Sequence, residues 1–235
     1  MLAEMPVADV SLTELSRRVG LAKSNVLRYF DSREAVLLEL LDDAWRDWLA
    51  GLAADLGSGP GDPGGPDGSG GPRRPDGPGG SGGAGGADGP DGATAVGPGG
   101  SAAERREWMA AAVAGSLAAR PVLCDLLGAQ AAVLERNVSA AVAARFKRAA
   151  IDNVAALGRL LQAAVPELGD AAAERLAAAT VLVAGALWAH GQPSAAVLAA
   201  YAADPSLAVF QVDFGGTLTE VIAVLVAGLI ARGMP

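Results

Sequence analysis

The chain has 235 residues, of which 51% are apolar and only 4% are aromatic. Its formal net charge of −8 excludes a protein that coats nucleic acid non-specifically with its whole surface. Alanine and leucine, both strong helix formers, supply much of the apolar fraction. The composition therefore predicts an all-α fold with enough apolar side chains for a sizeable core.

The rare residue types exclude several classes of site. Cys124 is the only cysteine and His190 the only histidine, so an intramolecular disulfide is excluded and a reducing compartment is favoured. The apolar stretches 176–189 and 221–231 are shorter than the roughly 20 residues that a bilayer needs, so we expect a soluble, cytoplasmic protein without a membrane partner. Because the sequence contains no catalytic constellation, we expect neither an enzyme, a metal site nor a cofactor.

Short helices are predicted near the N-terminus. Ser11 followed by Glu14 forms a capping box for a first helix, which Gly20 ends. A second short helix is expected over 22–30, and Asp31 opens a longer helix whose apolar residues keep helical spacing. Two short helices joined by a glycine turn are typical of a helix-turn-helix, whose second helix enters the major groove of DNA.

This segment carries the side chains that we expect to contact DNA. Between Ser11 and Arg33 the chain has five basic and two acidic residues, a local charge of +3 on an acidic protein. Asn pairs with adenine and Arg with guanine, while the N–H groups of a helix N-terminus bind phosphate. The predicted DNA-binding residues are Ser11, Lys23, Ser24, Asn25, Arg28, Tyr29 and Arg33. Composition alone leaves a solvated basic face on a helical hairpin about equally open.

A segment of different composition divides the chain. Residues 57–100 are dominated by Gly, Pro, Asp and Ser and have almost no large apolar side chain. Such a segment cannot offset the entropy lost on ordering, so we predict that it is disordered. The predicted organisation is a helix-turn-helix domain with its connecting helix at 1–56, the insertion at 57–100, and a helical effector-binding and dimerisation domain at 101–235.

The C-terminal part is predicted to be a helical bundle. Helices over 102–119, from Pro121 onward and over 139–165 each have one apolar stripe. Helices over 170–190 and 217–232 are apolar around nearly the whole circumference and must be covered on two sides. We predict that a second subunit supplies this cover in a four-helix bundle across a two-fold axis. The alternative is that these two helices form the centre of a monomeric bundle.

Other side chains are candidates for ligand binding or for purely structural roles. The candidates for binding an effector are Trp108, Gln130 and Trp188. His190 is expected to contact carbonyl groups at a helix end rather than to line an effector pocket. Cys124 is expected to be a buried structural cysteine rather than a redox sensor, because the chain offers no resolving partner.

The stretch SLTELSRRVGLAKSNVLRYFDSREAVLLELL resembles the DNA-binding signature of the TetR family of transcriptional regulators. The spacing agrees throughout the stretch, and its Ala- and Leu-rich texture is similar to that of actinobacterial members. The residues on characteristic positions are Ser11, Leu15, Ser16, Gly20, Leu21, Tyr29, Phe30, Arg33 and Val36 or Leu37.

The resemblance implies a ligand-responsive regulator, more often a repressor than an activator, that binds a palindromic double-stranded DNA operator as a homodimer. A small-molecule effector would bind within the C-terminal helices and release the operator. The family has a helix before this motif, whereas residues 1–10 here contain Pro6, so we expect that first helix to be truncated or missing. The alternative function is a dimeric helical ligand-binding or interaction protein whose DNA binding is impaired by this loss.

Overall fold

We describe the fold from a computed structural model, which places residues 7, 10–11, 13, 30–57 and 100–233. In this part of the chain the regular secondary structure is helical and contains no strand, which confirms the predicted all-α class. The elements in chain order are α3 (Arg33–Gly57), α4 (Ala102–Ala118), α5 (Pro121–Ala129), the π-helix η2 (Gln130–Leu134), α6 (Ala140–Ala164), η3 (Pro166–Leu168), α7 (Asp170–His190), α8 (Ala195–Ala203), η4 (Pro205–Phe210) and α9 (Phe214–Ala231).

Local capping groups determine where several of these helices begin. The Ser101 hydroxyl accepts a hydrogen bond from the Glu104 N–H at 3.2 Å, and the Glu104 carboxylate accepts one from the Ser101 N–H at 2.7 Å. Pro121 occupies the first turn of α5, and Ser139 caps α6. The predicted starts of α4, α5 and α6 are therefore confirmed to within one residue.

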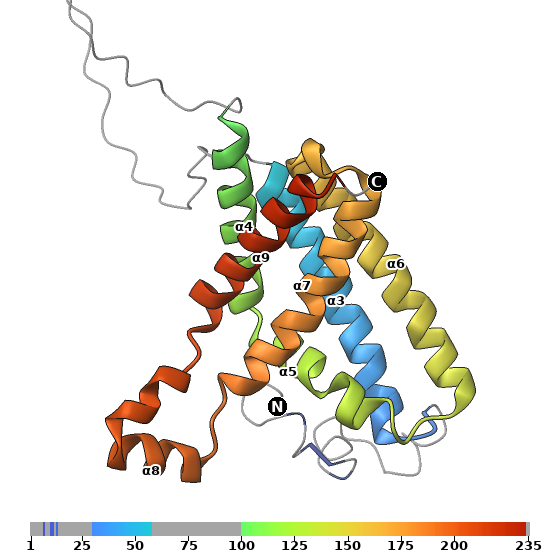
Figure 1. Ribbon diagram of the computed structural model, residues 1–235. Helices are drawn as coiled ribbons and strands as arrows, with labels where there is room; N and C mark the ends of the chain where they lie inside the picture. The colour runs from blue at the N-terminus through green and yellow to red at the C-terminus, as the bar shows by residue number, and fades with distance from the viewer. Residues whose placement is uncertain (1–6, 8–9, 12, 14–29, 58–99, 234–235) are drawn as a thin grey trace, which may run out of the picture.

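Helix α3 runs lengthwise through the bundle and packs against α4, α5 and α6 (Figure 1). Its buried side chains include Trp45 and Trp48. Helix α7 crosses in front of α3 in the same view and packs against α5, α6 and α9, while α9 also packs against α4. The connecting helix α3 thus lies inside the C-terminal body, where one continuous apolar cluster joins it to the other helices.

Helices α5 and α7 cross with their backbones in contact at two glycines. A Cβ atom at Gly185 would lie 3.0 Å from the carbonyl oxygen of Leu127 and 3.1 Å from the amide nitrogen of Gly128. A Cβ atom at Gly128 would lie 3.0 Å from the carbonyl oxygen of Gly185. Backbone atoms cannot turn aside as a flexible side chain can, so the crossing requires the absence of a side chain at both positions.

We expect Gly185→Ala to destabilise the protein by about 1–3 kcal/mol, because the added methyl group overpacks this crossing. Gly115 provides a matched control, because it is also helical and an added Cβ there meets nothing within 4 Å. Gly115→Ala should stabilise the protein by about 0.5–1 kcal/mol, the usual helix preference for alanine. Thermal unfolding followed by circular dichroism measures both effects. Equal changes in Tm would contradict the close crossing.

Helices α7 and α9 each bury a single stripe in this chain. The buried residues of α9 are Leu218, Ile222 and Val226, which lie four residues apart on one face. On other faces, Val224 of α9 is 63% exposed and Leu182 of α7 is 74% exposed. Only 17% of the residues of α9 are buried within the subunit. Much of the apolar circumference noted in the sequence is therefore left uncovered by the described part of the chain.

By length and composition, α7 and α9 are each long enough and apolar enough to cross a membrane. Helix α4 taken together with the segment 121–134 passes the same test, although the two halves are bent by 87°. The two continuous helices are longer than the stretches 176–189 and 221–231 on which our expectation of a soluble protein was based. The difference arises because a more polar turn extends each helix at its N-terminal end.

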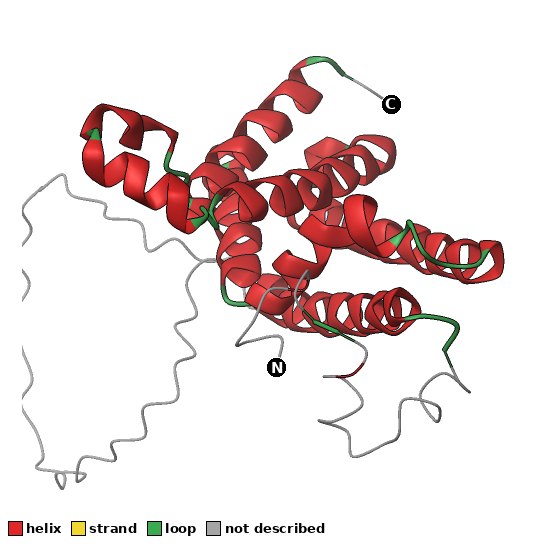
Figure 2. Ribbon diagram, turned by 90° about the horizontal axis from the view of Figure 1, so that it is seen from below, coloured by secondary structure: helices red, strands yellow, loops and turns green. Residues whose placement is uncertain are grey.

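Helix α8 and the 3-10 segment η4 are elements that the sequence patterns did not predict. The α8 segment AAVLAAYAA has no polar face, so helical periodicity gives no signal there. Ser194 caps the helix by accepting a hydrogen bond from the Val197 N–H at 3.4 Å. Together α8 and η4 extend away from the bundle at one end (Figures 1 and 2).

Candidate functional site

Most of the side chains predicted to contact DNA lie outside the described residues. These are Lys23, Ser24, Asn25, Arg28 and Tyr29. Ser11 is described and exposed, and Arg33 is the first residue of α3. Base recognition by this segment therefore stays a prediction.

Arg33 links the N-terminal segment to the helical body. Its Nη2 atom donates to the carbonyl oxygen of Val7 at 2.8 Å. The Val7 N–H donates in turn to Oδ2 of Asp125, on α5, at 2.6 Å, and the Val7 side chain is fully buried. Arg33 thus has an intramolecular partner, and the phosphate contact that we predicted for it stays a prediction.

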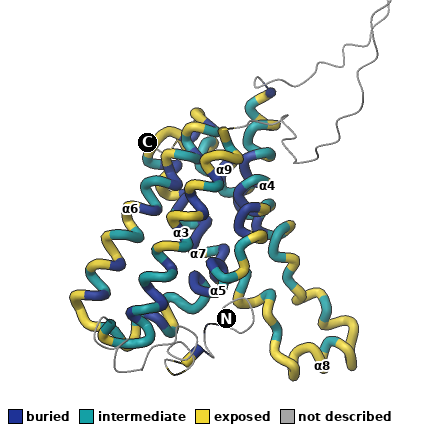
Figure 3. Tube along the Cα trace, turned by 180° about the vertical axis from the view of Figure 1, so that it is seen from behind, coloured by how far each residue is buried: buried dark blue, intermediate teal, exposed yellow. Residues whose placement is uncertain are grey.

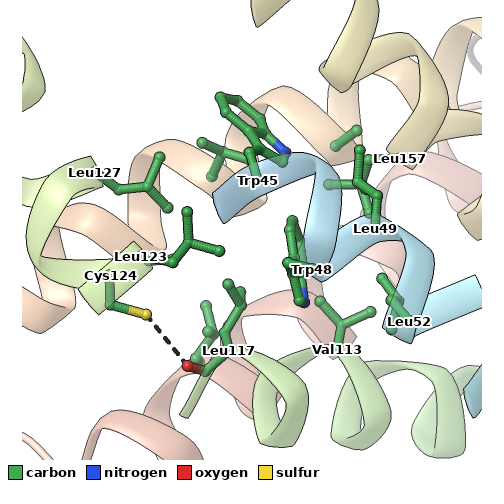
Figure 4. Packing of buried hydrophobic residues seen from close by; sticks show 14 of the residues in the cluster. Trp45, Trp48, Leu49, Leu52, Val113, Leu117, Leu123, Cys124, Leu127 and Leu157 are labelled. Atoms are coloured by element: carbon green, nitrogen blue, oxygen red, sulfur yellow. Dashed lines mark hydrogen bonds between the residues drawn. The ribbon is translucent and has the colours of Figure 1, made fainter. Parts of the chain in front are cut away.

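Two tryptophans of α3 lie in the core, and in the described part of the chain only one of them has a hydrogen-bond partner for its indole N–H (Figure 4). Trp48 is fully buried, and its Nε1–H donates to the Ser116 hydroxyl at 2.9 Å. Trp45 is 2% exposed, and its Nε1 has no hydrogen-bond partner among the described residues. Leaving a buried donor unpaired costs about 1–3 kcal/mol. Trp45 therefore offers a hydrogen bond to any acceptor that enters this core.

Further buried polar groups lie on α6 and α7. Oγ1 of Thr180 has no partner in the described part of the chain, and the residue is 1% exposed. Asn153 is 6% exposed and donates from Nδ2 to Oδ1 of Asp42, on α3, at 2.8 Å. A cavity of about 70 Å³ between α3 and α6 is lined in part by Asp42 and Phe146. The apolar core to which α3, α6 and α7 contribute thus contains a few polar groups, of which, among the described residues, the Asn153 side chain is paired and the Thr180 hydroxyl is not.

A larger cavity, of about 500 Å³, lies where α8 and η4 join the bundle. Its polar lining residues are His190, Tyr201, Gln211 and Asp213. Nδ1 of His190 lies 2.8 Å from the carbonyl oxygen of Ala186, which confirms the predicted contact with a helix-end carbonyl. His190 also lines the cavity. Its position therefore allows both the contact with a helix-end carbonyl and a role in an effector pocket.

The three side chains predicted to bind an effector have separate local partners. Trp108 is half-buried on α4 against the core. Gln130 donates from Nε2 to Oε1 of Glu135 at 2.7 Å. Trp188 packs edge-on against Phe214, with ring centroids 5.2 Å apart. In the described residues none of the three lines the 500 Å³ cavity, and their role in binding an effector stays a prediction.

Sequence reasoning did not identify Thr180, and it did not distinguish Trp45, whose indole N–H is unpaired within the described part of the chain, from Trp48. Helical spacing places both residues on buried faces, as the structure has them. A sequence pattern shows burial but cannot show that a buried polar atom lacks a partner, because that depends on the packing of neighbouring helices. Trp48 and Trp45 look equivalent in the sequence for this reason.

The Glu135 side chain links η2 to α6 through hydrogen bonds. The Glu135 carboxylate accepts hydrogen bonds from Gln130 and from Lys147, each at 2.7 Å. Burial would raise the pKa of Glu135, but the hydrogen bonds from Lys147 and Gln130 and the charge of Lys147 together lower the pKa below its ordinary value. Among the described residues no group of three or more His, Cys, Asp or Glu side chains is placed to hold a metal ion.

Cys124 is buried in the core beside α4. Its thiol donates to the carbonyl oxygen of Leu117 at 3.3 Å (Figure 4). Burial, assisted by the charge of Asp125, raises the pKa of the Cys124 thiol to about 12. The predicted burial of Cys124 is confirmed.

We expect Cys124 to resist iodoacetamide at mildly alkaline pH, because the raised pKa leaves almost no thiolate. Ala141→Cys supplies a comparison thiol at an exposed position on α6. Mass spectrometry should find rapid labelling of that added cysteine, and labelling of Cys124 only after unfolding in guanidinium. Labelling of both cysteines at one rate in the folded protein would show that Cys124 is accessible and reactive.

A comparison with protein families matches the helical body described above. The family model described as Tetracyclin repressor-like, C-terminal domain, matches residues 90–233. The matched range contains the helices from α4 to α9. A comparison with curated proteins finds no match for the chain.

Proposed function

Because the matched range covers more than half of its residues, this chain belongs to the TetR family of regulators, and we propose that it is a repressor released from its operator by a small molecule. The observation that carries the proposal is the position of α3. The DNA-binding signature ends within this helix, and the same helix continues without a break into the core of the family-matched body. A change in that core therefore has a direct route to the recognition segment.

The proposed active form is a homodimer in which α7 and α9 of two subunits form a four-helix bundle. The exposed apolar side chains Leu182 and Val224 support this assignment, because a soluble protein must cover such a surface. We also propose a cytoplasmic location, because a regulator of this family must reach DNA. The second subunit, rather than lipid, would cover the apolar faces of both helices.

In the proposed complex each subunit places its second N-terminal helix in the major groove. Lys23, Ser24, Asn25 and Arg28 would reach base edges, whereas Ser11, Tyr29 and Arg33 would hold the phosphate backbone. A two-fold dimer presents this helix twice, which suits half-sites about 34–36 Å apart in a palindromic operator.

The proposed effector is a small apolar or amphipathic molecule that carries a hydrogen-bond acceptor. The support is the unpaired Nε1–H of Trp45, together with the unpaired hydroxyl of Thr180. Because each of the two atoms lies in the packed core, a ligand must separate neighbouring helices to reach either of them. Movement would reach the N-terminal segment along α3 and through the link from Asp125 to Val7 and Arg33. A coupling of about 1–3 kcal/mol is typical of such regulation.

The DNA-binding proposal is tested on the base-contacting side chains. Asn25→Ala combined with Arg28→Ala is expected to weaken operator binding by about a hundredfold or more, because each lost base contact is worth roughly 1–3 kcal/mol. Gel shifts with the intergenic DNA beside the gene, at several salt concentrations, measure the affinity.

Arg148→Ala is the control for this experiment, because it removes one positive charge from an exposed position on α6, outside the proposed dimer interface. We expect it to leave the affinity within about twofold, since single surface contacts away from DNA contribute little. Unchanged operator affinity in the double variant would contradict the proposal that Asn25 and Arg28 contact DNA bases. Failure of the unaltered protein to shift any intergenic fragment would favour the alternative, a ligand-binding protein without operator recognition.

The effector proposal is tested with a pair of substitutions on α3. Both Trp45→Phe and Trp48→Phe remove one indole from the core, but only Trp48→Phe also loses a hydrogen bond, to Ser116. Trp48→Phe should therefore lower the free energy of unfolding by about 0.5–1.5 kcal/mol more than Trp45→Phe. Denaturant titration measures this difference.

Benzophenone, an aromatic ketone whose carbonyl accepts a hydrogen bond, is a suitable first ligand probe. It should raise the Tm of the unaltered protein and of Trp48→Phe, and raise it less in Trp45→Phe. Irradiation should label residues around Trp45 and Thr180. Equal Tm shifts in all three proteins, or labelling confined to the outer faces, would contradict an effector site in this core.

A further inference from the structure

The segment that joins α7 to α9 forms a projecting arm, which we define as residues 194–210. It consists of α8 and η4, and neither element contains a buried residue (Figure 3). Its exposed large apolar side chains are Val197, Leu198, Leu207, Val209 and Phe210, of which Val209 is 80% and Phe210 72% exposed. Asp204 is the only charged residue in the arm. A surface this apolar is unusual on a soluble monomer and indicates a partner.

The arm is not covered by its own subunit. In the described part of the chain, the substantial contacts of α8 are with η4, so the arm packs mainly on itself. The 500 Å³ cavity lies between the arm and the bundle, lined by Tyr201 on one side and His190 on the other. Figures 1 and 3 show the arm standing clear of the other helices. Its apolar side chains therefore remain available to another molecule.

The chemistry of the arm limits what that molecule is. Helices that bind membrane surfaces combine an apolar face with many Lys and Arg side chains, and nucleic-acid-binding segments are also basic. The arm has no Lys or Arg, and its one charge, on Asp204, is negative. An apolar surface with a single charged residue is instead complementary to another apolar protein surface.

A second copy of this chain offers such a surface. The arm is continuous in the sequence with α7 and α9, whose outward side chains Leu182 and Val224 are likewise apolar and exposed. We infer that the arm of each subunit packs on the partner subunit, next to the proposed α7–α9 bundle, so that two arms are exchanged across the two-fold axis. This inference rests on the proposed homodimer, and a two-fold interface requires the contact to be reciprocal. Arm exchange would also bring the partner against the open side of the 500 Å³ cavity.

Charged substitutions in the arm test this inference. Val209→Asp with Phe210→Asp places two carboxylates on the exposed part of the arm, and Leu182→Asp places one on the outer face of α7. Sedimentation equilibrium over a concentration series gives the dimer Kd of each variant. If the arm packs on the partner, the double arm variant should raise the Kd at least tenfold. Leu182→Asp should do the same, because it disrupts the α7–α9 bundle.

The control is Ala50→Asp with Ala141→Asp, which adds the same charge at exposed positions on α3 and α6. It should leave the Kd within twofold. Circular dichroism checks that all variants remain helical. Independently of any substitution, hydrogen exchange on the unaltered protein should show protection of 194–210 that increases with protein concentration as the dimer forms.

The outcomes separate the arm from the dimer itself. If Leu182→Asp yields monomers while the arm variant keeps the original Kd, the arm inference is overturned and the dimer stands. If the unaltered protein is monomeric at every concentration, the proposed dimer fails and the inference fails with it. A lower Tm with unchanged Kd means that the arm folds onto its own subunit. Flotation with anionic phosphatidylserine vesicles that the arm variant abolishes would assign the arm to lipid, which also overturns the inference.

Discussion

Trp45, Trp48 and the leucines around them hold α3 in the bundle, where α4, α5 and α6 pack against it. Burying a large apolar side chain stabilises a fold by about 1.5–3 kcal/mol, so a helix with this many buried positions determines where its neighbours pack. The same helix begins directly after the predicted recognition segment. One element thus contributes to the stability of the body and connects that body to the proposed DNA-binding unit.

Some of the polar groups inside this core have hydrogen-bond partners and others have none in the part of the chain that the structure describes. Trp48 and Asn153 have partners on neighbouring helices, and such pairs fix the packing of α3 against α4 and α6. Trp45 and Thr180 have none in the described residues. An unpaired buried group lowers stability, and a ligand that supplies the missing partner regains that free energy.

The exposed apolar surfaces of α7 and α9 follow from the way in which these helices pack on the bundle. Helices α7 and α9 each have one stripe facing the bundle, and a helix can present only one stripe to a single neighbouring layer. Their remaining apolar side chains, together with those of the arm, face outward. These surfaces are the basis for the proposed dimer and for the inferred arm exchange, in which a second copy of the chain covers the exposed apolar side of the subunit.

The sequence by itself determined the helical class, the starts of α4, α5 and α6, and the resemblance to the family that the comparison then showed. These features depend on interactions between residues three or four positions apart, such as the pair Ser101 and Glu104, or on a contiguous motif. Only the tertiary structure decided that Gly128 meets Gly185, that Trp48 is paired while Trp45 is not, and that Trp188 packs on Phe214. Those facts depend on how helices that are distant in the sequence pack against one another. The spacing of apolar residues along a helix shows only which face is buried, and it is the same for every such packing arrangement.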